Sequence, residues 1–294
     1  MDTDHLSHDR QLIPSPASEH LDRLSAFIEQ NHPLFVLTGA GCSTDSGIPD
    51  YRDINGDWKQ AKPVPFQDFI RYHSVRQRYW ARSMLGWPRV AKAAPNTAHR
   101  VLESMERAKL ISTLVTQNVD GLHRKAGHRN VIDLHGNLAG VRCLGCNVHY
   151  SRTSIQSAIA SCNPVFTHVT ADTSPDGDAH LHGIDVSGFE VPACAECGGI
   201  LKPDVVFFGE SVPGPRVERA FHWLEESRGM LVVGSSLAIY SGFRFCRRAA
   251  DRAIPVAAIN LGRTRADAMF KLKVEMNCAK ALSGVKLRLF DGAS

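Results

Sequence analysis

Short apolar runs recur along the chain at intervals that suit strands separated by helices. They cover Leu34–Thr38, Leu110–Thr116, Val131–Leu134, Val205–Phe208, Met230–Val233 and Val256–Ile259. Continuous apolar character over a few residues is typical of a strand buried on both faces, as in a parallel sheet. The pattern therefore predicts an α/β fold with helices covering a parallel sheet.

Helical patterns separate several of these runs. Ser18 is placed to cap a first helix, and Asn96 a second. The apolar face of the first helix consists of Leu21, Leu24, Phe27 and Ile28. Pro215 suits the first position of a helix over Pro215–Arg228. Residues 1–17 are polar and are expected to form a flexible N-terminal arm.

Two segments interrupt the alternation of strands and helices. Residues 53–95 hold no clear strand and are rich in aromatic residues and arginine, and residues 138–202 carry two cysteine pairs. Between Arg152 and Lys202 there is neither lysine nor arginine, while acidic residues accumulate. We predict that both segments form a smaller inserted domain. The sheet domain then comprises residues 18–52, 96–137 and 203–294.

The two cysteine pairs are Cys143-x-x-Cys146 and Cys194-x-x-Cys197, separated by 47 residues. Four thiolates on two tight turns suit a closed tetrahedral zinc site, which leaves no open coordination position and is therefore structural. The separation exceeds that of ordinary zinc ribbons, which an inserted segment explains. The alternatives are two unrelated turns or a redox motif.

A glycine-rich turn, Gly39 to Gly47, follows the first predicted strand directly. Glycines there let backbone N–H groups approach a phosphate. Thr44 stands where a GxGxxG motif has its third glycine, and no acidic strand end follows at the expected distance, which disfavours a hydride-transferring Rossmann enzyme. Gly234–Ser236 and Asn260–Gly262 follow two further strands. Ligands of open α/β sheets bind at such carboxyl ends, so together these segments predict a dinucleotide site, although each alone is more often a plain turn.

Two histidines follow predicted strands. His135 ends one strand beside polar residues and is the better candidate for a general base, although a core or surface role is the ordinary one for any of the 14 histidines. His123 lies at the start of a predicted helix and is expected to pack or to cap.

Composition narrows the class of protein. The 294 residues give room for about two domains, and 43% apolar with 22% charged residues is ordinary for a globular protein. A net charge of +4 is too balanced to indicate a nucleic-acid partner, and no apolar run is long enough for a membrane helix. The N-terminus has no apolar leader pattern, so we expect a cytoplasmic protein whose eight cysteines serve as metal ligands or core residues rather than disulfides.

Taken together, these motifs resemble the sirtuins, a family of NAD-dependent protein-lysine deacylases. The segments that carry the resemblance are Gly39–Arg52, Thr116–His123, His135–Gly136, the two cysteine pairs, Lys202–Glu210 and Gly234–Ser236. Arg76–Trp87 and Ile239–Arg244 most resemble class II sirtuins, the branch of the mitochondrial lipoamidase and ADP-ribosyltransferase member. Since a mitochondrial presequence is missing, the resemblance is to a bacterial, cytoplasmic relative. Cys42 departs from the aliphatic residue common in that branch.

The resemblance implies a Rossmann-like domain and a zinc-bearing domain with NAD in the cleft between them. The carbonyl oxygen of an acyl-lysine attacks the nicotinamide ribose, nicotinamide leaves, and the acyl group passes to ADP-ribose. His135 is implied as the base, and Asn118 and Asp120 as residues that orient the ribose and the nicotinamide. The NAD contacts that it implies are Gly39, Ala40, Gly41, Thr44, Asp50, Tyr51, Arg52, Gln117, Asn118, Val119, Asp120, Gly234, Ser235, Ser236, Asn260, Leu261, Gly262 and Cys278.

The resemblance also implies that the substrate peptide adds as a strand between Val206–Gly209 and Ile239–Gly242, with Phe207 beside the acyl-lysine. Val205–Phe208 as an interior strand is the alternative. Tyr79 and Arg82 have the spacing by which desuccinylating sirtuins hold an acyl carboxylate, or they belong to an ordinary surface helix. ADP-ribosyl transfer, lipoamidase activity and a binding role without catalysis remain alternatives. The sequence leaves the oligomeric state open and is compatible with a monomer.

Overall fold

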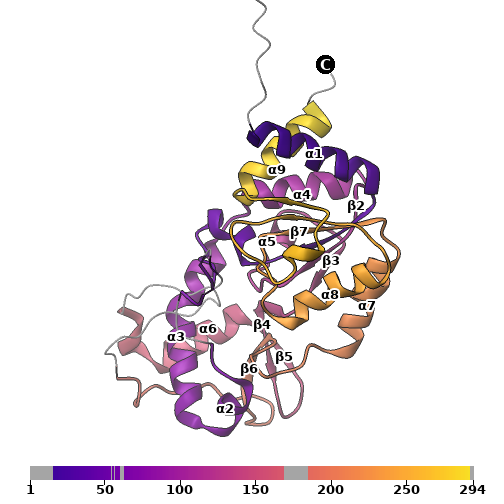
Figure 1. Ribbon diagram of the computed structural model, residues 1–294. Coiled ribbons are helices and arrows are strands. Elements are labelled where there is room, and N and C mark those ends of the chain that lie inside the picture. Colours follow the sequence, from indigo (N-terminus) through magenta and orange to yellow (C-terminus); the bar gives the residue numbers. More distant parts are fainter. Residues whose placement is uncertain (1–15, 54, 56, 60–62, 169–184, 292–294) are drawn as a thin grey trace, which may run out of the picture.

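The computed structural model describes every residue of the chain except 1–15, 54, 56, 60–62, 169–184 and 292–294. Its centre is a six-stranded parallel sheet in the order β3-β2-β1-β7-β8-β9 (Figure 1). The strands are β1 (Leu34–Thr38), β2 (Ile111–Thr116), β3 (Val131–Asp133), β7 (Gly229–Val233), β8 (Val256–Ile259) and β9 (Leu272–Val274). The predicted α/β fold on a parallel sheet is confirmed.

The apolar runs are buried because helices cover both faces of this sheet. Along β1, Leu34 and Val36 belong to one apolar cluster, while Phe35 and Leu37 belong to another on the opposite face. The first cluster includes side chains from α1 (Pro16–Asn31), α4 (Thr97–Arg107) and α9 (Cys278–Lys286), and the second from α7 (Gly214–Glu225) and α8 (Tyr240–Asp251). In Figure 1 these two helix groups lie on opposite sides of the strands.

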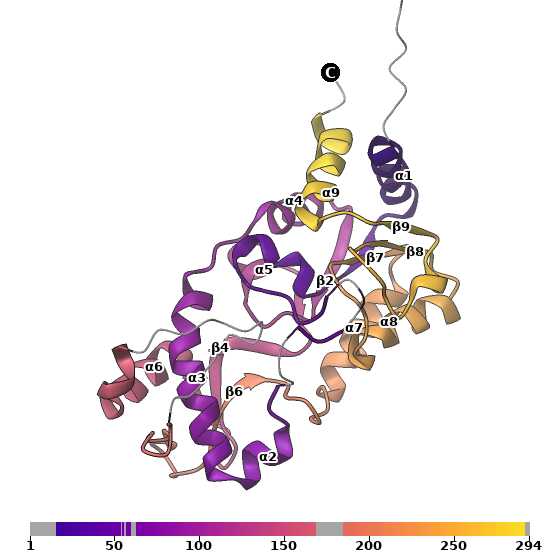
Figure 2. The ribbon, with the colours of Figure 1, turned by 60° about the vertical axis from the view of Figure 1, so that its left-hand side comes forward.

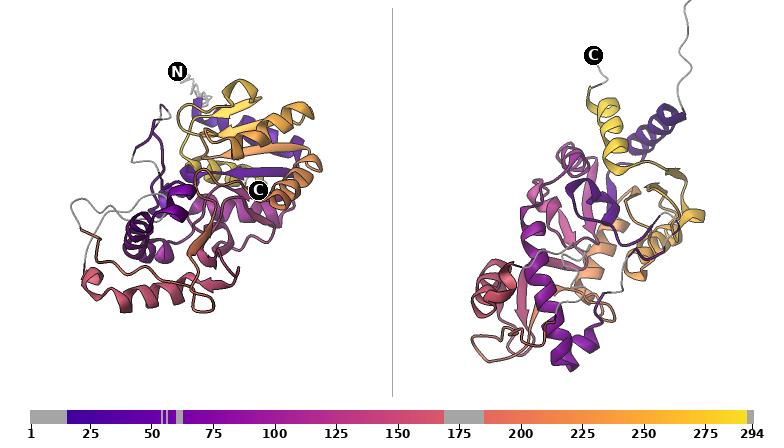
Figure 3. Two further views of the ribbon diagram at one scale, coloured as in Figure 1. Left: turned by 90° about the horizontal axis from the view of Figure 1, so that it is seen from below. Right: turned by 90° about the vertical axis from the view of Figure 1, so that its left-hand side faces the viewer.

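A smaller module contains elements from residues 66–92 and 136–205. Its antiparallel sheet has the order β5-β4-β6. Its elements are β4 (Gly136–Cys143), β5 (His149–Ser151), β6 (Leu201–Val205), α2 (Phe66–Arg71), α3 (His73–Lys92) and α6 (Arg152–Cys162). A third apolar cluster joins them. Figures 2 and 3 show α2, α3 and α6 gathered around β4 and β6, away from α1 and α9.

Short helical turns complete the described structure. They are η1 (Ala40–Cys42), η2 (Thr44–Ser46), α5 (Leu122–Lys125), η3 (Pro164–His168), η4 (Asp267–Met269) and η5 (Leu287–Asp291). Two of them, η1 and η2, make up the glycine-rich turn after β1, so the backbone coils tightly there instead of entering a long helix.

The first residues of α4 and α1 show whether the two predicted helix caps are present. The Asn96 side chain accepts hydrogen bonds from the backbone N–H groups of Ala98 and His99, so the predicted cap of α4 is confirmed. The prediction for Ser18 is wrong, because α1 begins at Pro16 and Ser18 lies within the first turn. The Ser18 hydroxyl instead accepts a hydrogen bond from Arg288 at 2.9 Å, which ties α1 to the C-terminal turn.

The apolar run Val205–Phe208 is not a strand of the large sheet, contrary to the prediction. Val205 ends β6, which pairs antiparallel with β4 in the small module. Phe207 turns into the apolar cluster of that module, where its ring centroid lies 5.1 Å from that of Phe69. The run is apolar because it packs against aromatic rings. The hydrophobic pattern of a sequence cannot distinguish such packing from burial within a sheet.

Among the described residues, no helix combines the length and the apolar character that crossing a membrane requires.

Candidate active site

The carboxyl ends of β1, β2, β7 and β8 open into one large cavity of about 800 Å³. Gly39, Gln117, Gly234 and Asn260 follow these four strands and line the cavity. In a parallel sheet all these ends lie along the same edge, so loops far apart in sequence meet there. Its volume falls in the range of small-molecule and cofactor sites.

The glycines bring the backbone close together at the floor of this cavity. A methyl group on Gly39 would lie 2.7 Å from the carbonyl oxygen of Gly234, and one on Gly234 would lie 2.4 Å from the backbone nitrogen of Cys42. Gly234 also has φ +63°, which disfavours other residues. The β1 and β7 turns therefore form a narrow backbone cradle of the kind that phosphates occupy.

Three polar side chains form a network beside this cradle. The Ser43 hydroxyl donates to Asp120 Oδ2 at 2.7 Å and accepts from Asn118 Nδ2 at 3.0 Å. Asn118 also donates to the Gly39 carbonyl at 3.0 Å, which joins the β2 loop to the glycine turn. Burial raises the pKa of the Asp120 carboxyl, and hydrogen bonds from Leu122 N–H and the Ser43 hydroxyl oppose that rise.

His135 lines the same cavity and lies immediately before β4. Its Nδ1 is 3.0 Å from the Gln117 carbonyl oxygen, an atom that only accepts, so Nδ1 carries the proton. Nε2 therefore has a lone pair, and the Ser241 hydroxyl is 2.8 Å away to donate to it. The backbone fixes this imidazole in the tautomer that a general base requires.

The pKa of His135 is lowered to about 4, chiefly by burial and to a smaller extent by the positive charges of Arg216 and Arg244, while the hydrogen bond to the Gln117 carbonyl opposes the shift. The imidazole is consequently neutral at physiological pH. A neutral ring with an accessible lone pair can take a proton from a hydroxyl group of a ligand in the cavity.

An aromatic region continues the cavity toward the small module. Tyr79 on α3 lines it, and its ring centroid lies 5.2 Å from that of Phe207 and 5.3 Å from that of Phe69. The Phe207 N–H donates to the Glu210 carboxylate at 2.9 Å, and buried Lys202 pairs with the same carboxylate at 3.0 Å. This ion pair holds the segment after β6 against the cavity.

The sequence-predicted site residues divide into two groups. Those that line the cavity are Gly39, Ala40, Gly41, Asp50, Tyr51, Arg52, Tyr79, Gln117, Asn118, Val119, Asp120, His135, Val206, Phe207, Gly234, Ser235, Ser236, Asn260 and Leu261. Thr44, Arg82, Gly262 and Cys278 are not among the described lining residues. Thr44 instead donates to the Gly41 carbonyl at 3.2 Å and stabilises the turn.

Sequence reasoning missed Ser43 and Ser241. Ser43 lies inside the glycine motif, so its place in the motif was a signal, but its partners come from the β2 loop. Ser241 lies in the first turn of α8 and reaches His135 across 106 residues of sequence. No local pattern identifies such a pair.

The segment expected to receive a peptide on the far side of the cleft is only partly extended. Ile239 has extended backbone angles, whereas Tyr240–Gly242 form the first turn of α8, so Ile239 is the residue of this segment whose backbone is extended. Ile239 and Tyr240 are exposed, as is Phe208 across the cavity.

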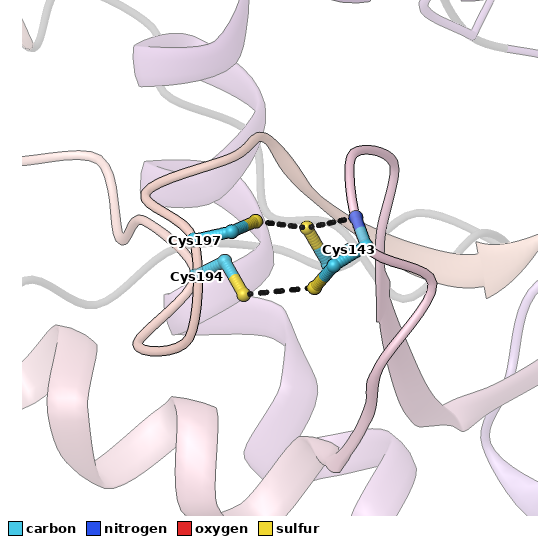
Figure 4. A group of neighbouring side chains, drawn as sticks. Cys143, Cys194 and Cys197 are labelled. Atoms are coloured by element: carbon cyan, nitrogen blue, oxygen red, sulfur yellow. Dashed lines mark hydrogen bonds between the residues drawn. The ribbon is translucent and has the colours of Figure 1, made fainter.

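The four predicted zinc ligands come together in the small module, and Figure 4 shows Cys143, Cys194 and Cys197 of this group. The sulfur atoms of Cys143 and Cys197 are 3.5 Å apart, and those of Cys146 and Cys194 are 3.6 Å apart. Tetrahedral zinc with bonds of about 2.3 Å separates its sulfurs by ~3.8 Å, so the cluster fits the ion. A hydrogen bond from the Tyr150 hydroxyl lowers the pKa of Cys194 to about 6. We call Cys143, Cys146, Cys194 and Cys197 the four-cysteine cluster.

Comparison with known proteins agrees with this geometry. The model of the Sir2 family matches residues 39–241, which hold the cradle, His135 and the four-cysteine cluster. The chain belongs to the Sir2 family. Its sirtuin fold, a Rossmann-like sheet with a module suited to zinc, is thereby established.

Several sirtuins are similar over nearly the whole chain. The NAD-dependent protein deacetylase of Xanthomonas campestris pv. campestris (strain 8004) is 55% identical over 260 residues, 88% of this chain and 89% of the relative. NAD-dependent protein deacetylase 2 of Bradyrhizobium diazoefficiens (strain JCM 10833 / BCRC 13528 / IAM 13628 / NBRC 14792 / USDA 110) is 54% identical, covering 88% and 95%. The solved structure "Sir2-p53 peptide-NAD+" has a TM-score of 0.74 and 26% identity, covering 93% of this chain and 99% of that one.

Proposed function

We propose that this sirtuin is an NAD-dependent protein-lysine deacetylase that transfers the acyl group of a modified lysine to ADP-ribose and releases nicotinamide. One observation carries the proposal: the neutral His135, with its lone pair on Nε2, lines the same cavity as the glycine cradle. The names of the bacterial relatives support the same activity.

We propose one orientation for NAD in the cavity. The backbone cradle of Gly39, Gly41 and Gly234 suits the diphosphate, because N–H groups and small residues there admit a close anion. Asn260 follows β8 at one end of the cavity and suits the adenosine. Asn118 and Asp120 follow Gln117, whose carbonyl holds His135, and suit the ribose and carboxamide of the nicotinamide.

In this arrangement His135 accepts a proton from a ribose hydroxyl, so that the oxygen attacks the activated acyl carbon. Nδ1 keeps its proton on the Gln117 carbonyl and holds the ring in place. Ser241 occupies the lone pair of Nε2 when no hydroxyl of a substrate is there. The four-cysteine cluster lies in the small module, and zinc there would stabilise β4 and the turns around it rather than take part in the reaction.

The acyl-lysine is proposed to enter beside Phe207 and Tyr79. Their aromatic rings make the walls of that part of the cavity apolar, which favours acetyl and longer uncharged acyl groups. The peptide backbone would lie between Val206–Gly209 and Ile239–Gly242, where Phe208 and Ile239 are exposed. The assignment to the class II branch is part of this proposal.

A carboxylate grip by Tyr79 and Arg82 stays a prediction. If it exists, Arg82→Ala reduces hydrolysis of succinyl-lysine or glutaryl-lysine much more than that of acetyl-lysine. Equal effects on the two kinds of substrate would exclude it. Measuring initial rates on matched peptides decides between these outcomes.

The test of the main proposal is incubation with NAD and a panel of acyl-lysine peptides. Deacylated peptide, nicotinamide and O-acyl-ADP-ribose in equal amounts are expected, and His135→Ala should abolish all three while the circular dichroism spectrum is unchanged. ADP-ribose attached to protein would indicate a transferase, and an absence of NAD consumption would indicate a binding protein. Either result contradicts the proposal.

A further inference from the structure

A second group of metal-ligating side chains lies outside the four-cysteine cluster. It consists of Cys42 in η1, His99 in α4 and His123 in α5, and their ligand atoms all lie within 4.8 Å of one another. All three side chains are buried, with 0–2% of their surface exposed. We call these three residues the Cys-His-His group. Cys42 is the residue that departs from the resemblance described above.

Each imidazole of the group has one nitrogen held by an oxygen and one without a partner. His99 Nδ1 is 2.9 Å from Asn96 Oδ1, and His123 Nε2 is 2.9 Å from the Thr38 hydroxyl. His99 Nε2 and His123 Nδ1 are buried and have no hydrogen-bond partner among the described residues. Leaving such atoms unpaired costs free energy, so native proteins seldom do it.

The tautomer of His99 directs a lone pair into the group. Asn96 donates its amide N–H to the Cys42 carbonyl, which fixes Oδ1 as the atom facing His99. The Asn96 backbone N–H also lies 3.3 Å from His99 Nδ1, but the contact with Asn96 Oδ1, an atom that only accepts, is shorter at 2.9 Å, so we assign the proton to Nδ1 and the lone pair to Nε2. Metal-binding imidazoles characteristically donate their other N–H to an oxygen in this way.

From this geometry we propose that Cys42, His99 and His123 form a binding site for a monovalent copper ion. One thiolate and two neutral imidazoles balance a single positive charge, whereas a divalent ion would leave an uncompensated charge in a buried place. The described residues supply three donors here, so zinc would need a water molecule as its fourth ligand in this buried place, whereas copper is suited to a trigonal site of one thiolate and two imidazoles. Binding replaces the thiol proton by Cu⁺, and that proton passes to solvent.

The ion needs only a small adjustment and has a route of entry. Three donor atoms at about 2.0–2.3 Å from an ion lie ~3.7 Å from one another. The ligand atoms of the group now lie within 4.8 Å of one another, so binding requires them to approach by about 1 Å at most. Gly41 and Ser43, on either side of Cys42, line the large cavity, so the ion enters from the nucleotide cleft.

The experiment uses the zinc-loaded protein with Cu⁺, added anaerobically as its acetonitrile complex and competed by a chromophoric copper(I) chelator. One equivalent of Cu⁺ is expected to bind without release of zinc, and its X-ray absorption spectrum should show mixed sulfur and nitrogen ligands. Cys42→Ala should reduce the bound copper by about one equivalent. Cys246→Ala, which removes a buried thiol in the opposite apolar cluster, should not.

Some results overturn the proposal. Copper that binds only by displacing zinc, or a spectrum with sulfur ligands alone, would place it in the four-cysteine cluster. Equal binding by Cys42→Ala and by the original protein would also exclude the site. His123→Asn gives a second measurement if Cys42→Ala fails to fold, since it removes a nitrogen ligand and should lower copper affinity at least tenfold. Because no deacylation is measured, these outcomes do not depend on the proposed function.

Discussion

The pH dependence of deacylation tests the environment of His135. Burial lowers the pKa of this imidazole to about 4, compared with 6.5 for an ordinary histidine. At pH 5.5 a group with a pKa of about 4 is ~97% neutral, whereas an unperturbed histidine is ~9% neutral. If His135 is the base, the structure predicts kcat/KM at pH 5.5 to be about tenfold higher than an ordinary histidine allows.

The assay measures kcat/KM for an acetyl-lysine peptide at saturating NAD, between pH 4.5 and 8. This parameter reports the ionisation of the enzyme before the peptide binds. We expect a flat profile from pH 8 to about pH 5, with a fall below that. Circular dichroism at each pH checks that the protein remains folded.

A tenfold loss of kcat/KM between pH 7.5 and pH 5.5 in folded protein would refute the reasoning about burial. Arg216→Gln provides a further check, because Arg216 lowers the pKa by its charge and lies outside the cavity lining. Removing that charge should move the acid limb to higher pH only modestly, since burial is the larger cause.

Three further predictions concern stability. Gly136→Ala should destabilise the protein by about 3 kcal/mol or more in urea unfolding, because φ is +85° and the new methyl carbon would lie 2.0 Å from the Asp204 carbonyl oxygen. Gly188→Ala, which meets nothing within 4 Å, is its control, and equal losses would contradict the argument. Removing zinc with a strong chelator should lower the melting temperature, and adding zinc back should restore it. An unchanged melting curve would exclude a structural ion. Burial lowers the pKa of His99 to about 4, so the unfolded chain takes up its proton at higher pH than the folded chain does. The contribution of neutral His99 to the free energy of unfolding is complete above pH 6.5, and about 3 kcal/mol of it is lost by pH 4. His99→Gln should therefore reduce the slope of the free energy of unfolding against pH in this range.

Local chemistry determined much of the fold from sequence alone. The run Leu34–Thr38 is apolar at nearly every position, and only a strand covered on both faces buries all of it. Asn96 caps its helix with its own side chain, so neighbouring residues were sufficient to predict it. The spacing within each cysteine pair likewise fixes two sulfur atoms on one turn, so the four ligands of the cluster were found.

Short or polar elements escaped the sequence analysis for physical reasons. β9 has only three residues, which is too short for a recognisable sequence pattern. It is a strand because it pairs with β8. Val205–Phe208 was misread because an apolar run is equally suited to a sheet and to an aromatic cluster. The pattern shows that the residues are buried, but the partner that buries them is decided by packing.

The chemistry of the site was decided by tertiary structure. The sequence places His135 at the end of a strand, and the resemblance marks it as a base, but its tautomer depends on the Gln117 carbonyl and its low pKa on burial. The contact with Ser241 joins positions 106 residues apart. Hydrogen bonding and desolvation act through space, so these properties arise only after β2, β4 and α8 meet at the edge of the cavity.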